Sequence, residues 1–126
     1  MKVAYVDTSV LLAIAFREGD GAAARRRLES FDLLVASNLV EAELRAALRR
    51  EDAPSDAPLL NRISWVSPQR PLSPEITVVL GAGQLRGADL WHLACALYLA
   101  PSPRDLSFLT LDTRQGAAAE KLGFPA

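Results

Sequence analysis

The sequence predicts an α/β protein, a three-layer α/β/α sandwich whose central, mainly parallel sheet is flanked by helices on both faces. Two observations lead to this fold class. Short apolar runs typical of strands alternate with helical segments along the chain, and strands separated by helices pair in parallel. Half of the 126 residues are hydrophobic, which is enough to fill a core. The length fits a single domain, residues 1–126.

The bounds of the elements are predicted from the periodicity of hydrophobic residues and from Gly, Pro and capping residues at their ends. Strands are expected at 2–6, 33–36, 64–66 and 107–111. Helices are expected at 8–16, 22–30, 39–50, 74–82, 88–100 and 113–122, with a short helix after a loop at 51–58. Ser37 or Asn38 should cap the helix over 39–50, and Gly123 should end the last helix.

Composition excludes several classes of protein. No apolar run is long enough to cross a membrane, and residues 1–20 lack the pattern of a signal peptide. The single Cys95 excludes an internal disulfide and fits a reducing compartment, so we expect a cytoplasmic protein. One His and one Cys cannot form a zinc site of the usual nitrogen and sulfur type. A metal would therefore bind to oxygen ligands, which suits Mg²⁺ or Mn²⁺.

Three aspartates stand where predicted elements begin or end. Asp7 follows the first strand and Asp112 follows the strand at 107–111, so both should lie at the carboxyl edge of the sheet, where functional residues of α/β proteins gather. Asp89 opens the apolar helix ADLWHLACALYLA. Each alone can be read as a helix N-cap, worth about 1 kcal/mol. Asp112 with Gln115 even resembles a capping box.

Glu43 cannot be explained as a cap, because it lies in the middle of the helix over 39–50. On a helical wheel, Glu41 falls on a polar arc with Arg45, whereas Glu43 falls on the apolar arc between Leu39 and Ala47. It should point toward the core or into a cleft. Clustered carboxylates repel by roughly 4 kcal/mol per pair at 4 Å and an effective dielectric of 20, and a divalent cation reverses that sign.

Four segments together resemble the PIN-domain family, and more narrowly the VapC-like toxins of type II toxin–antitoxin systems. They are AYVDTSVLLAI, ASNLVEAELRAAL, RGADLWHLACAL and LSFLTLDTRQGAAAEKLGF, in that order and spacing. The resemblance implies a Mg²⁺- or Mn²⁺-dependent ribonuclease that cleaves RNA phosphodiesters by attack of metal-bound water. It also implies a homodimer and inhibition by a protein antitoxin across the active-site groove. The implied catalytic and metal-binding residues are Asp7, Glu43, Asp89 and Asp112, with Asp7 and Asp89 central.

Other residues are assigned smaller roles. Thr8 or Ser9 would help to position the site. Many relatives carry a further acidic residue just after the fourth carboxylate, whereas Thr113 to Gly116 follow here, so a second metal site is in doubt. Arg114 could contact phosphate, although a solvated helix start is the plainer interpretation.

The remaining residues whose side chains could take part in chemistry or binding are expected to have structural roles. His92 is expected to be a packed, hydrogen-bonded core residue and Cys95 a small core filler. Trp65 and Trp91 are expected in the core or in a dimer interface. Setting the four carboxylates aside leaves 11 acidic residues against 14 Lys and Arg, a balance of +3 that is compatible with RNA docking.

Three alternatives remain at this point. One is a PIN-type RNA-processing nuclease without an antitoxin, which gene neighbourhood would distinguish. Another is a receiver-like phospho-acceptor domain, which normally needs paired acids after its first strand and a late lysine after a strand; here Asp7 stands alone and Lys121 lies inside the last helix. The third is a catalytically dead PIN-like binding module, which would have no need to keep four mutually repelling carboxylates.

Overall fold

The computed structural model describes residues 1–54 and 57–126; residues 55 and 56, in the loop expected at 51–58, lie outside the described residues. The strands are β1 (Val3–Val6), β2 (Leu33–Ser37), β3 (Ile63–Val66) and β4 (Ser107–Leu109). The helices are α1 (Thr8–Ala15), α2 (Gly21–Glu29), α3 (Asn38–Arg50), α4 (Ala57–Asn61), α5 (Ser73–Leu80), α6 (Gly87–Leu99) and α7 (Thr113–Leu122), with a 3-10 turn at Pro103–Asp105. The predicted alternation of strands and helices is confirmed.

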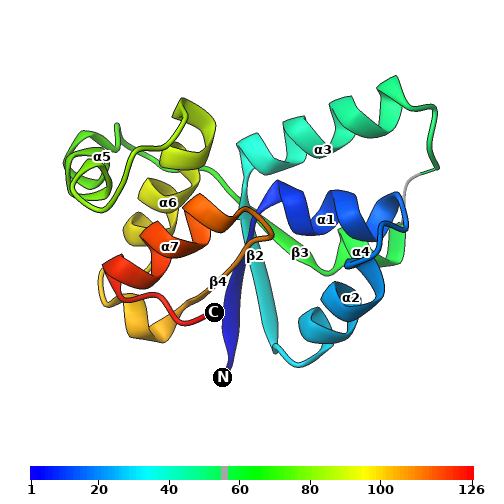
Figure 1. The fold of residues 1–126 in the computed structure, drawn as a ribbon, viewed down its shortest axis with the longest axis horizontal. Helices are drawn as coiled ribbons and strands as arrows, with labels where there is room; N and C mark the ends of the chain where they lie inside the picture. The colour runs from blue at the N-terminus through cyan, green and yellow to red at the C-terminus, as the bar shows by residue number, and fades with distance from the viewer. Residues whose placement is uncertain (55–56) are drawn as a thin grey trace.

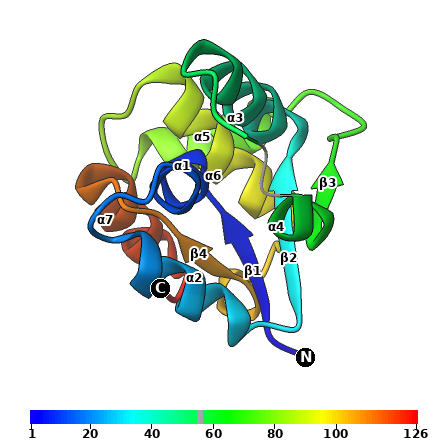
Figure 2. The same ribbon diagram turned by 90° about the vertical axis from the view of Figure 1, so that its right-hand side faces the viewer.

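The four strands form one parallel sheet in the order β3-β2-β1-β4. Figure 1 shows α1 to α4 on one side of the sheet and α5 to α7 on the other, and Figure 2 shows the same layers after a quarter turn. The expected α/β/α sandwich is therefore confirmed. No helix in the described ranges is long and apolar enough to span a membrane.

The central position of β1 explains its sequence. Ala4, Tyr5 and Val6 have no exposed surface, because β1 is flanked by β2 and β4 and covered on both faces. A strand buried on both faces reads as a continuous apolar run, as this one does. Pairing of Val6 with Leu109 brings the ends of β1 and β4 to the same place. Whatever follows these two strands must therefore meet at one edge.

β4 is shorter than the strand expected at 107–111. The main-chain N–H of Asp7 donates to the oxygen of Leu109 over 2.9 Å, and the ladder ends there. Beyond it, Ser9 Oγ accepts from the N–H of Leu111 over 3.0 Å. Side-chain hydroxyls thus replace strand pairing at this point, and the chain turns away from the sheet to begin α7.

Two predicted helix ends are confirmed. Ser37 is the N-cap of α3, and its hydroxyl accepts from the N–H of Val40 over 3.3 Å. Gly123 follows α7 with φ of 101°, the left-handed conformation for which glycine is preferred. Ser37 matters beyond its capping role, because it also lies at the end of β2, beside the edge that β1 and β4 share.

Candidate functional site

Asp7 lies at the junction of β1 and α1. It is the N-cap of α1, as its position predicts, and Oδ2 accepts from the N–H of Ser9 over 3.1 Å. The residue is only 4 % exposed. A buried carboxylate needs more than one capping bond, since burial disfavours its charge. The further partners come from the other end of the chain.

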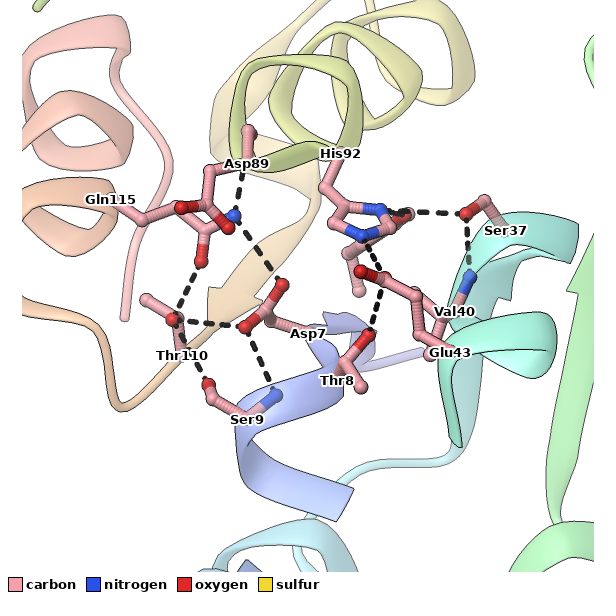
Figure 3. Close-up of polar contacts among 11 residues, drawn as sticks. Asp7, Thr8, Ser9, Ser37, Val40, Glu43, Asp89, His92, Thr110 and Gln115 are labelled. Carbon is pink, nitrogen blue, oxygen red and sulfur yellow. Dashed lines mark hydrogen bonds and ion pairs between the residues drawn. The ribbon is translucent and has the colours of Figure 1, made fainter. Parts of the chain in front are cut away.

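Those partners are Thr110 and Gln115 (Figure 3). Gln115 Nε2 donates to Asp7 Oδ1 over 3.3 Å and to the main-chain oxygen of Asp89 over 3.3 Å. Thr110 Oγ1 donates to Gln115 Oε1 over 2.7 Å and lies 3.4 Å from Asp7 Oδ2. Gln115 has no exposed surface, so its amide is committed to this network. One side chain thus joins α7, the end of β1 and the start of α6.

The capping box expected for Asp112 and Gln115 is only half correct. Asp112 is the N-cap of α7, and Oδ1 accepts from the N–H of Gln115 over 2.8 Å. The reciprocal bond is missing, because Thr110 Oγ1 accepts from the N–H of Asp112 over 3.0 Å instead. The side chain of Gln115 is therefore available to turn inward, toward Asp7. The carboxylate of Asp112 stays at the surface.

Glu43 lies on a second network, formed by α3, α6 and the two central strands. It accepts from Thr8 Oγ1 over 2.9 Å and from His92 Nε2 over 2.8 Å, both at Oε1. Its side chain is 35 % exposed, so it lies at the margin of the core rather than inside it. The inward direction predicted from the helical wheel is what these contacts show.

His92 is buried and hydrogen-bonded, as expected, but its partner was not foreseen. The ring is 1 % exposed. Its Nδ1 lies 2.9 Å from the Tyr5 hydroxyl and 3.4 Å from Ser37 Oγ. Burial raises the pKa of Tyr5 well above its usual value, so the hydroxyl keeps its proton. Because a carboxylate only accepts, His92 donates from Nε2 and fixes the orientation of Glu43.

Asp89 is not a helix cap. The N-cap of α6 is Arg86, which makes no capping bond through its side chain, and Asp89 is the third residue of the helix. The helix begins at Gly87, one residue before the start expected from the sequence. Burial raises the pKa of Asp89, and the charges of Asp7, Asp112 and Glu43 raise it further, while His92 lowers it. The four carboxylates thus share one electrostatic neighbourhood.

The donors at this edge suit a divalent cation in kind. Carboxylate oxygens are what Mg²⁺ and Mn²⁺ prefer, and a cation would relieve the repulsion that Asp89 experiences. The donors are not drawn around one point, however: within residues 1–54 and 57–126, no three His, Cys, Asp or Glu side chains form a group that could hold a metal. Figure 3 shows that Asp7 and Glu43 take part in separate hydrogen-bond networks.

The supporting residues are placed as follows. Thr8 donates to Glu43. The main-chain N–H of Ser9 donates to Asp7, and the Ser9 hydroxyl accepts from the N–H of Leu111 after β4. Arg114 is exposed and lines a pocket with Asp89 and Asp112. Sequence reasoning missed Gln115, Thr110 and the role of His92. For His92 a signal existed: it is one helical turn after Asp89, on the same face of α6.

Fold and site together define a class, a parallel α/β protein with acidic groups gathered at the carboxyl edge of its sheet. The model of the PIN domain family matches residues 4–121, nearly the whole chain, and the chain belongs to that family. PIN domains are nucleases that generally depend on divalent metal ions and act on RNA or DNA. Among curated proteins, none matches the chain.

Proposed function

We propose that the protein is a Mg²⁺- or Mn²⁺-dependent endoribonuclease, a phosphodiester hydrolase that acts in the cytoplasm as the VapC-like toxin of a toxin–antitoxin pair. One observation carries the nuclease part. Four carboxylates from separate segments of the chain lie in one neighbourhood, and the pKa of Asp89 is raised in part by the other three. A divalent cation bound among these carboxylates would offset their mutual repulsion.

Asp7 and Asp89 are the proposed central ligands, and Glu43 and Asp112 would take part directly or through water. When bound, a divalent cation lowers the pKa of a coordinated water and stabilises charge on phosphoryl oxygens. Hydrogen bonds within the chain orient two of the proposed ligands. Gln115 and Ser9 hold the two oxygens of Asp7, and Thr8 and His92 hold one oxygen of Glu43. The other oxygen of Glu43 is left for a water or a cation.

The experiment that tests this function uses purified protein with total RNA that includes tRNA, in Mg²⁺, in Mn²⁺ and in EDTA. Asp7→Asn is the matched variant, because it keeps the shape of the residue and removes its charge. Discrete fragments that need metal and vanish in the variant are expected. An unchanged cleavage rate in Asp7→Asn would refute the site. No cleavage and no metal binding by calorimetry would refute the function.

The toxin role and its partners are tested separately. A homodimer and a protein antitoxin that covers the acidic edge are proposed from the resemblance to VapC-like toxins. Growth arrest on expression of the wild type, but not of Asp7→Asn, supports the toxin role. Cleavage activity without growth arrest, together with the lack of a neighbouring antitoxin gene, would instead indicate an RNA-processing nuclease.

A further inference from the structure

A small polar pocket adjoins the carboxylates and contains two arginines from the same two segments. Its volume is about 250 Å³, and it is lined by Gln84, Leu85, Arg86, Asp89, Asp112 and Arg114. Arg86 precedes Asp89 by three residues, and Arg114 follows Asp112 by two. The folding that places the two aspartates at this pocket therefore places both arginines at its lining as well.

The side chains of these two arginines are not paired within the described part of the protein. Both are exposed, and within the described part of the chain neither guanidinium group has an ion-pair or hydrogen-bond partner, although Asp89 and Asp112 line the same pocket. Arginines elsewhere behave differently: Arg45 pairs with Glu41 at 2.9 Å and Arg70 with Glu75 at 2.6 Å. Two unpaired guanidinium groups at a pocket are suited to an anion with several oxygens, and phosphate is such an anion.

We propose that Arg86 and Arg114 form a subsite for the backbone phosphates of single-stranded RNA next to the bond that is cut. This inference rests on the proposed ribonuclease function and deepens it. The pocket lining contains no aromatic side chain on which a base could stack, so contact with the backbone rather than with a base is favoured. The subsite therefore holds and orients the strand without reading its sequence, while selection of the RNA target depends on other surfaces.

The test measures equilibrium binding of a labelled single-stranded RNA over a range of salt concentrations. All proteins carry Asp7→Asn, so that the RNA stays intact. Arg86→Ala and Arg114→Ala should each lower the slope of log Kd against log salt by about 0.7, because one phosphate contact is lost. At physiological salt this corresponds to roughly three- to fivefold weaker binding per arginine. Arg49→Ala, which removes an equally exposed charge near the end of α3, should change neither quantity.

A second readout separates substrate binding from site assembly. In the otherwise wild-type protein, Arg86→Ala and Arg114→Ala should raise KM and leave kcat and the Mn²⁺ affinity measured by calorimetry nearly unchanged. Salt slopes equal to those of Arg49→Ala would overturn the subsite, and so would a loss of Mn²⁺ binding, which would make the arginines supports of the carboxylates. If the wild type neither binds nor cuts RNA, the proposed function fails; if it does both and the arginine variants match it, only the subsite fails.

Discussion

Gln115 donates a hydrogen bond to Asp7 across 108 positions of sequence, and the same nitrogen donates to the main chain of Asp89. One buried amide therefore joins the carboxylate of Asp7 to the main chain of Asp89, the two residues that are proposed as central metal ligands. It supplies a positive partial charge to Asp7 without adding a competing full charge, which a lysine would do. The direction of Asp7 thus depends on a residue that is not itself a candidate ligand.

Gln115→Leu should therefore destabilise the fold and weaken metal binding. The change leaves the buried Asp7 carboxylate and the partly buried Asp89 carbonyl each one donor short, which costs about 1–3 kcal/mol of the free energy of unfolding. Urea unfolding measures this cost, and calorimetry with Mn²⁺ measures the affinity. Gln84→Leu, at an exposed glutamine beside the site, is the control and should unfold like the wild type. Equal stability of both variants would contradict the bridge.

His92→Leu should reduce cleavage without abolishing it. The proposed ligand Glu43 would keep Thr8 as its only donor, and the loss of such an orienting partner typically lowers metal affinity or activity by about 10- to 100-fold. The Tyr5 hydroxyl would lose its contact with Nδ1 as well, so stability must be measured in parallel. Full activity in a folded His92→Leu protein would show that Glu43 needs no such support.

Asp89→Asn should make the metal-free protein more stable at neutral pH. The pKa of Asp89 is raised in the folded state, so folding binds its proton more tightly and the ionised form costs stability. That cost is absent below the unfolded pKa, near 4, and grows as the pH rises through the folded pKa. In EDTA, the Tm of the variant should exceed that of the wild type at pH 7, and the two should converge near pH 3. A gap that widens toward acid would contradict the shift.

Cys95 should be inert in the native protein. It has no exposed surface, and burial raises its pKa to about 11. At pH 8 only about one thiol in a thousand would be ionised, even if the reagent could reach it. Labelling by a thiol-reactive dye should follow global unfolding in urea. Rapid stoichiometric labelling without denaturant would show that α6 opens locally.

Gly21→Ala should destabilise the contact between α1 and α2. A Cβ at Gly21 would lie 2.5 Å from the main-chain oxygen of Ala13, and backbone cannot move aside as a side chain can. We expect a loss of about 1–3 kcal/mol. Gly116→Ala in α7 is the matched control: its Cβ would meet only Thr110 Cγ2 at 3.6 Å, so it should stabilise by about 0.5–1 kcal/mol. Thermal unfolding of both variants distinguishes the two glycines.

The positions of three of the candidate site residues can be predicted from the sequence, because they depend on the order of the elements and on helical periodicity. Asp7 and Asp112 follow strands, and parallel strands end at one edge. Glu43 is revealed by its place on a helical wheel. The bridge made by Gln115 is not readable, since the local pattern predicts a bond to the N–H of Asp112, which Thr110 takes instead. The partners of His92 lie 49 and 87 positions away, and only the assembled core brings them to it.

The strand order has a consequence for synthesis of the chain. β1 is made first, yet it pairs on one side with β4, and Asp7 contacts Thr110 across 103 positions. Such non-local pairing forms late and slows folding. While a ribosome still holds the last third of the polypeptide, neither Asp112 nor Gln115 can join Asp7. The proposed acidic site of this PIN domain therefore cannot assemble until the segment that carries β4 and the start of α7 has left the ribosome.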